Sequence, residues 1–220
     1  MTKNLLIAAV AVLLGAQDSP FNGKDLSGWK FKGSEAKSKW KVGKAVWDKE
    51  SAAKLTLAEG DELVNVDGKG VDLYTEAKWG DAVIEVEVLV PKGSNSGVYV
   101  MGEYEVQVLD SFGKEKVGAG DMGGLYGASA PKVNASKAAG EWQKFVIDYR
   151  APKFDDKGAK TANMKFVKIE LNGQVLHENV EMKGPTPSGV TGKEAATGPI
   201  MFQGDHGPVA YRALKVTPVK

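Results

Sequence analysis

The chain has 220 residues, 42% hydrophobic and 26% charged, which is the composition of a folded globular protein rather than a disordered one. Its formal net charge is only +1, without the basic excess by which proteins bind nucleic acid. The lack of cysteine excludes disulfides, thiol nucleophiles and Cys-ligated metal centres, and two histidines are too few for a three-histidine site.

The N-terminal segment has the pattern of a secretory signal peptide. Lys3 precedes ten consecutive apolar residues, 5–14, which are followed by Gly15 and Ala16. Ten residues are too few to cross a bilayer as a helix, which takes about 20. We therefore expect residues 1–16 to be removed. Residues 17–220 would then form one domain that is secreted or periplasmic and has no membrane span.

The rest of the chain is rich in short segments typical of β-strands. In segment 82–90, Ile84, Val86 and Val88 alternate with Glu85 and Glu87. Further strands are expected over 97–101, 104–109, 143–150, 166–171, 174–178, 200–203 and 210–219. Between two of them, Asn172-Gly173 favours a tight hairpin turn. No long window has the apolar periodicity of a helix, so we predict an all-β fold, a two-sheet antiparallel β-sandwich of jelly-roll type.

Two segments lack this alternation and are expected to be loops. Segment 112–136 is rich in glycine and contains Tyr126, and we expect it to form a wall of a binding site. Segment 184–198 contains Pro, Gly, Ser and Thr throughout, and we expect a mobile surface loop without a role in binding.

Seven short motifs occur in order along the chain. They are Phe21-Asn22-Gly23-Lys24-Asp25-Leu26-Ser27-Gly28-Trp29, Asn95-Ser96-Gly97-Val98-Tyr99, Tyr104-Glu105-Val106-Gln107-Val108-Leu109-Asp110, Gly124-Leu125-Tyr126-Gly127, Gly140-Glu141-Trp142, Leu171-Asn172-Gly173, and Gly198-Pro199-Ile200-Met201-Phe202-Gln203-Gly204-Asp205-His206-Gly207. Together they resemble the 3-keto-disaccharide hydrolase domain family over nearly the whole chain. The resemblance implies a concanavalin A-like β-sandwich that cleaves glycosides whose glucose is oxidised to a ketone at C3. The family usually has an arginine at the position of Met101, so a non-catalytic carbohydrate-binding module on the same fold is the alternative.

The chemistry of a 3-keto-glycoside requires a general base. The ketone acidifies the C2 proton, so a base can remove it, the C1 substituent can leave, and water can add afterwards. Alternation places Glu105 and Gln107 on the strand face opposite Val106 and Val108, which belong to the core. Glu105 is thus the candidate base or acid, and Gln107 is a hydrogen-bonding neighbour.

Glu103 lies in the turn before this strand and is expected to be exposed. A retaining glycosidase that uses Glu103 with Glu105 is not expected. Residues two apart on a strand lie about 7 Å apart, whereas retention needs carboxyl groups about 5–5.5 Å apart.

His206 is the second catalytic candidate, because the neighbouring carboxylate of Asp205 can set its tautomer and charge. Asp110 ends the strand of Glu105 and is the third; it either caps the next loop or joins Glu105 and His206 around a cation. The spacing of these groups is too scattered to assign a metal, so no cofactor is certain and a divalent cation stays open. His177, on a hairpin strand, is expected to be structural.

A second group of residues suits sugar binding. Tyr99, Tyr126 and Trp142 can stack on sugar faces, and Asn95 and Gln203 can bond to sugar hydroxyls. The expected partner is a carbohydrate, either a 3-keto-glycoside or another glycan.

Overall fold

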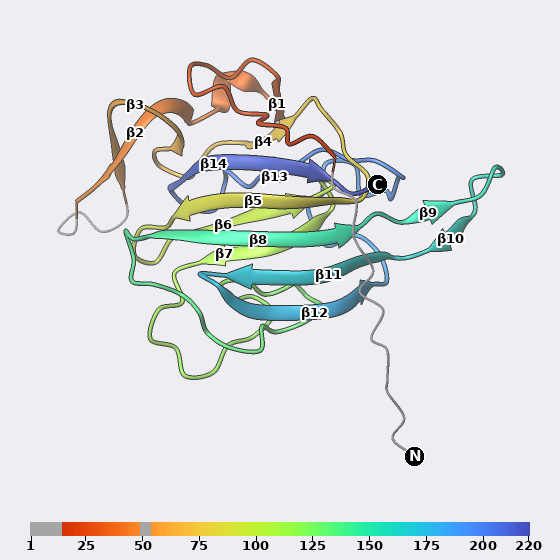
Figure 1. Ribbon diagram of the computed structural model, residues 1–220. Coiled ribbons are helices and arrows are strands. Elements are labelled where there is room, and N and C mark those ends of the chain that lie inside the picture. Colours follow the sequence, from red (N-terminus) through yellow and green to blue (C-terminus); the bar gives the residue numbers. More distant parts are fainter. Residues whose placement is uncertain (1–14, 49–53) are drawn as a thin grey trace.

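The computed structural model describes residues 15–48 and 54–220 as an all-β fold (Figure 1). Most of the expected signal peptide lies outside these ranges. None of the helices described is long and apolar enough to span a membrane. A single turn of 3-10 helix, η1 (Glu35–Lys37), precedes β2.

Two antiparallel sheets form the body of the molecule. The larger has the order β12-β11-β8-β5-β14-β3-β2, and the smaller has the order β1-β4-β13-β6-β7. The strands of the larger sheet, in chain order, are β2 (Trp40–Trp47), β3 (Leu55–Asn65), β5 (Ala82–Leu89), β8 (Trp142–Arg150), β11 (Met164–Leu171), β12 (Gln174–Met182) and β14 (Val209–Pro218). Those of the smaller sheet are β1 (Trp29–Lys32), β4 (Asp72–Thr75), β6 (Asn95–Val100), β7 (Tyr104–Leu109) and β13 (Met201–Phe202). A separate hairpin of β9 (Lys153–Phe154) and β10 (Lys160–Ala162) projects from the body (Figure 1).

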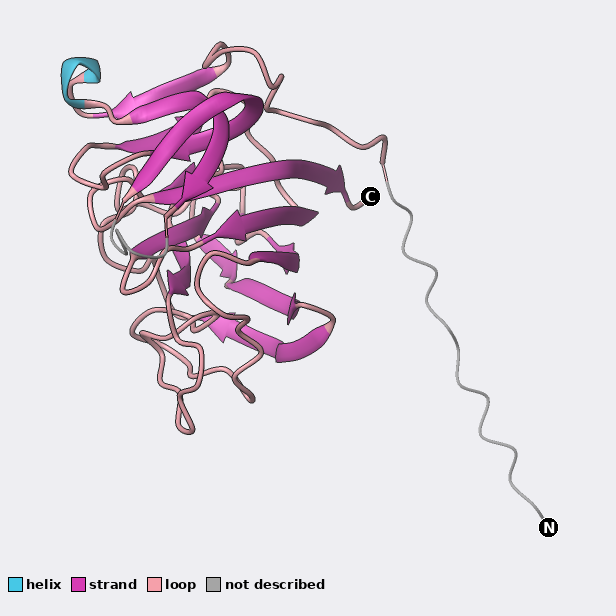
Figure 2. Cartoon of the chain, turned by 90° about the vertical axis from the view of Figure 1, so that its left-hand side faces the viewer, coloured by secondary structure: helices cyan, strands magenta, loops and turns pink. Residues whose placement is uncertain are grey.

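The sheets lie face to face and share one hydrophobic core (Figures 1 and 2). On β5, Ile84, Val86 and Val88 are fully buried, as the alternation predicts. A direct link between the sheets is the ring of Phe202 on β13, which stacks on Tyr211 of β14 with ring centroids 3.9 Å apart. The predicted two-sheet sandwich is thus confirmed.

Strands β6 and β7 are buried on both faces. One face packs in the core; segment 112–136 runs along the free edge of β7, and segment 184–198 lies against the other face. The first segment bonds along the free edge of β7, where the Tyr126 amide donates to the Glu105 carbonyl at 3.2 Å. The second is fixed at Thr186, whose amide donates to the Glu103 carbonyl at 2.9 Å. The segment expected to be a mobile loop is thus tied by backbone bonds to the turn before β7.

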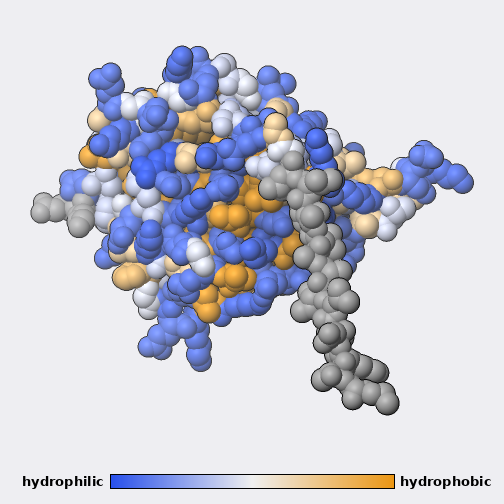
Figure 3. Space-filling model, in the orientation of Figure 1, coloured by the Kyte–Doolittle hydropathy of each residue, from blue (hydrophilic) through white to orange (hydrophobic). Residues whose placement is uncertain are grey.

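The outer face of the larger sheet has a different character. Figure 3 shows polar side chains interspersed with apolar ones there. Neighbouring strands carry ion pairs on this face, such as Lys144 with Glu85 at 2.5 Å and Arg212 with Glu87 at 2.6 Å. Such exposed pairs contribute little to stability, about 0–1 kcal/mol each, and suit a solvated surface.

Candidate functional site

A small cavity lies over β6 and β7, beneath the two covering segments. Its volume is ≈ 140 Å³. Strands β6 and β7 supply Asn95, Tyr99, Glu105 and Gln107, and loops supply Tyr126, Pro187, Ser188, Gln203 and His206. Seven of the nine site residues expected from the sequence thus line one cavity.

Strand register places the tyrosine and the carboxylate of this cavity side by side. Tyr99 on β6 is paired directly with Glu105 on β7, and its hydroxyl donates to Oε2 of Glu105 at 2.9 Å. Only 3% of Glu105 is exposed. Burial raises the pKa of Glu105 to about 7, against the opposing effects of the Tyr99 hydroxyl and the nearby charge of His206. Glu105 therefore exchanges a proton near neutrality, as a general acid or base must.

Tyr99 acts differently from its neighbour. Burial, with the Glu105 carboxylate as the next contribution, raises the pKa of Tyr99 above its ordinary value. The phenol consequently stays protonated and serves as a hydrogen-bond donor that orients the carboxylate.

Two acceptor atoms of the cavity have no partner within the described part of the chain. They are Oδ1 of Asn95 and Oε1 of Gln203, and both are buried. A buried carbonyl oxygen without a hydrogen bond costs free energy, so it calls for a donor from outside the chain. Sugar hydroxyl groups are donors of this kind.

His206 lies at the rim of the cavity. Its side chain is about half exposed, and its Nδ1 is hydrogen-bonded to Oδ1 of Asp205. The carboxylate orients the ring as expected, with Nε2 left for another partner. The other histidine, His177, is buried and bonds through Nε2 to the Gly123 carbonyl at 2.9 Å, so it has the expected structural role.

The structure places two of the expected site residues elsewhere. Trp142 begins β8, where Gln143 and Phe145 face inward, so alternation turns the indole outward. Cζ of Arg212 lies over this ring, 4.0 Å from its centroid. Asp110 accepts a hydrogen bond from the Gly93 amide at 2.9 Å and so fixes the β5–β6 turn. Neither lines the cavity. Over residues 15–48 and 54–220, moreover, no group of three or more His, Asp or Glu is arranged to hold a metal ion.

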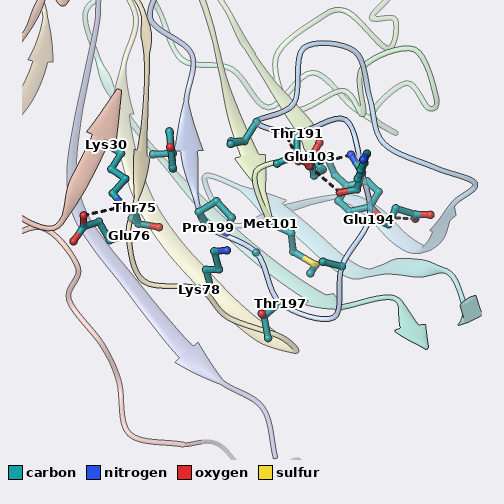
Figure 4. A pocket seen from close by; sticks show the side chains of 16 residues that line it. Lys30, Thr75, Glu76, Lys78, Met101, Glu103, Thr191, Glu194, Thr197 and Pro199 are labelled. Atoms are coloured by element: carbon teal, nitrogen blue, oxygen red, sulfur yellow. Dashed lines mark hydrogen bonds and ion pairs between the residues drawn. The ribbon is translucent and has the colours of Figure 1, made fainter. Parts of the chain in front are cut away.

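Glu103 is not exposed, contrary to expectation. Its carboxylate accepts hydrogen bonds from the amide and hydroxyl of Thr191, at 2.8 and 2.7 Å, and from the amide of Gly192 at 2.9 Å. Figure 4 shows it beside Thr191 in a second hollow, which Met101 also lines. The expectation fails because segment 184–198 folds back over the turn. Glu103 and Glu105 thus line different cavities, which agrees with the exclusion of a retaining pair.

Comparison with known protein families assigns the chain to one of them. The model of the 3-keto-alpha-glucoside-1,2-lyase-like domain matches residues 17–217. The chain belongs to this family. That membership confirms the resemblance seen in the sequence motifs. A comparison with curated proteins gives no match.

Solved structures support the same architecture. A candidate glycosyl hydrolase from Parabacteroides distasonis ATCC 8503 has a TM-score of 0.67 at 26% identity, over 98% of this chain and 94% of that chain. A second one from the same organism has a TM-score of 0.62 at 18% identity, over 93% and 94% of the two chains. At 18% identity, the second likeness concerns the fold alone.

Some residues near the cavity carry no signal in the sequence. Pro187 and Ser188 line it, and the Thr186 hydroxyl accepts the Glu105 amide at 3.0 Å. From β1, Lys32 donates to the Ser188 carbonyl at 2.5 Å and pairs with Asp72 at 3.3 Å. Met101 lines the hollow of Glu103 and not the Glu105 cavity.

Gly97 leaves the space that Glu105 occupies. A Cβ atom at this position would lie 2.5 Å from Oε1 of Glu105. We expect Gly97→Ala to displace the carboxylate and to lower turnover about 100-fold, because misplacing a catalytic group by about 1 Å has effects of that size. The fold should tolerate the change, since the atom displaced is the end of a side chain. Steady-state kinetics and thermal unfolding test this, with Gly120→Ala as the matched control, because its Cβ would meet nothing within 4 Å. Unchanged turnover in Gly97→Ala would contradict the placement of Glu105.

Proposed function

We propose that this protein cleaves glycosides whose glucose ring carries a ketone at C3, with Glu105 as the general base. The observation that carries the proposal is a buried carboxyl with a pKa of about 7, oriented by Tyr99 in a cavity that contains unpartnered amide oxygens. Family membership supplies the substrate class. As a lesser part of the proposal, resting on the N-terminal sequence alone, the protein is exported.

The proposed reaction is an elimination followed by hydration. Glu105 takes the C2 proton, and the electron pair of the C2–H bond passes through the enolate of the C3 ketone. The C1–O bond then breaks, which leaves a C1=C2 double bond conjugated with the ketone. The departing oxygen takes a proton from His206 in its protonated form. Addition of water across the double bond gives a 3-keto sugar, so the net result is hydrolysis.

The cavity has groups suited to the remaining tasks. Oδ1 of Asn95 and Oε1 of Gln203 accept hydrogen bonds from ring hydroxyls and so fix the sugar. Tyr126 is 41% exposed at the rim, where its ring can cover a sugar face. A volume of ≈ 140 Å³ lies below the roughly 300–1,000 Å³ of pockets for drug-sized ligands, which suits a single ring.

The direct test is to incubate the protein with 3-keto-trehalose and with trehalose, with and without a chelator, and to follow monosaccharide release. We expect release from the keto sugar alone. Because Glu105 must lose its proton to act as the base, kcat/KM should rise about tenfold per pH unit from about pH 5 up to about pH 7. Activity lost with the chelator and restored by a divalent cation would add a metal to the proposal.

The outcomes separate the alternatives. Sugar binding without release would favour the non-catalytic module. A rate that is highest at low pH and falls towards pH 7, without this rise, would make Glu105 the acid rather than the base. With neither binding nor release, the proposal fails.

A further inference from the structure

A third hollow adjoins the Glu105 cavity and has no role in the proposed chemistry so far. Its volume is ≈ 310 Å³. Two loops and a turn contribute to it, and His206 lines both this hollow and the Glu105 cavity. The residues used below are Asp67, Lys69, Lys92, Ser94, Asp205 and His206.

The same chain segments pass from one hollow to the other. Ser94 lines the third hollow and Asn95 the Glu105 cavity; likewise, Gln203 lines the cavity and Asp205 the hollow. The hydroxyl of Ser94 donates to the Pro208 carbonyl at 2.5 Å, which ties the two segments together. A ring bound over Glu105 would therefore have this hollow beside it, with His206 between the two.

The turn that closes this hollow is also held tightly. A Cβ atom on Gly68 would lie 2.2 Å from the Cα of Gly207, so the two backbones are in direct contact. Asn65 supports the turn from within the fold, because its Oδ1 accepts the Gly68 amide at 2.9 Å and its Nδ2 donates to the Gly204 carbonyl at 2.7 Å. The hollow is thus a preformed feature.

Its charges are unbalanced. Both carboxylates already have partners: Asp67 pairs with Lys39 at 3.6 Å, and Asp205 is bonded to His206. Lys69 and Lys92, in contrast, form no ion pair with any carboxylate in the described ranges. Two lysines without counter-charges give the hollow a positive potential, which favours an anionic group.

We propose that the third hollow binds the leaving group of the glycoside, and that Lys69 and Lys92 favour leaving groups that carry a carboxylate. This inference rests on the proposed function, because it takes the sugar over Glu105 as the ring that reacts. His206, on the wall shared by both hollows, then lies beside the C1–O bond that breaks. The substrate class becomes a 3-keto-glucoside of an acidic hydroxy compound, such as a hexuronic acid.

The test compares two leaving groups of equal shape and different charge. The probes are the 3-keto-glucosides of 3-hydroxybenzoate and of 3-hydroxybenzamide, and both kcat/KM and binding are measured. We expect the carboxylate to be favoured about tenfold at low salt, and less as added salt screens the lysines. The double variant K69Q/K92Q should lose this preference, so that its kcat/KM values for the carboxylate and the amide become equal.

A matched control is K78Q/K193Q, which removes the same charge from two lysines that line the hollow of Glu103 and Met101. It should keep the preference. Equal kcat/KM and binding for the two probes in the wild type, or a preference that survives in K69Q/K92Q, would overturn the proposal. If neither probe is cleaved, the proposed function fails. Binding alone then tests the lysines. Tighter binding of the carboxylate probe by the wild type, and loss of this preference in K69Q/K92Q, would support the site.

Discussion

Glu105→Gln is expected to abolish turnover and to make the protein more stable above pH 7. Glutamine keeps the shape of the side chain and an oxygen that accepts the Tyr99 hydroxyl, but it cannot remove a proton. A general base contributes about 10²–10⁴ to the rate, and we expect a loss near the upper end, because no other carboxylate lines the cavity. Binding of an uncleaved sugar should persist.

The gain in stability follows from the raised pKa. Burial holds the folded-state pKa of Glu105 at about 7, above its ordinary value of 4.5. Between these values the folded protein binds more protons than the unfolded chain, so the free energy of unfolding falls as the pH rises from 4.5 to 7. Above pH 7 the full cost, up to about 3 kcal/mol, is present, and Glu105→Gln removes it.

Thermal unfolding at pH 5 and pH 8 measures this difference. The variant should unfold a few degrees higher than the wild type at pH 8 and at nearly the same temperature at pH 5. Glu59→Gln is the matched control, since Glu59 is exposed, and it should change neither turnover nor stability. A variant that retains turnover would exclude Glu105 as the base. A variant less stable than the wild type at pH 8 would contradict the claim that the buried charge of Glu105 destabilises the fold.

His206→Ala is expected to slow cleavage by an amount that depends on the leaving group. If His206 protonates the departing oxygen, its loss should matter most for a sugar, whose alkoxide is a poor leaving group, and should cost about 10²–10⁴ in kcat. For 4-nitrophenol, which leaves readily as the anion, the loss should be small. The kcat values of both substrates measure the difference.

The second histidine provides the control. His177 is buried against the Gly123 carbonyl, so His177→Gln should lower the unfolding temperature without any loss that depends on the leaving group. Equal losses for both substrates in His206→Ala would point to a role in binding rather than proton transfer. Wild-type rates for both would remove His206 from the mechanism.

Much of the fold could be predicted because period-two patterns report burial directly. On β5 and β8, apolar residues such as Ile84 and Phe145 face the core, and the alternation locates both strands. The pattern is weak on β2 and β3, where lysine, glutamate and glycine interrupt the apolar residues of a hairpin at the edge of the sheet. There the hydrogen-bonded pairing between the strands decides the structure.

The site was less accessible to sequence reasoning than the fold. Alternation places Glu105 and Gln107 on the same face of β7. Glu103 would share that face only if the strand began before it. The chain instead turns at Met101 and Gly102, which both have positive φ. Residue type alone suggests that Trp142 stacks on a glycan, but the alternation of β8 points its indole outward, away from the cavity. The part played by segment 184–198 depends on long-range bonds to β7, which no local pattern reveals.

The attachment of segment 184–198 has a consequence for how such proteins diversify. This wall is joined to β7 through Thr186, and to the turn before β7 through the Glu103 carboxylate, while Glu105 and the Tyr99 hydroxyl that orients it belong to the strands. A loop of another length or sequence can replace it so long as these few anchors persist. Substrate range can then evolve by loop exchange, with the reacting groups inherited unchanged.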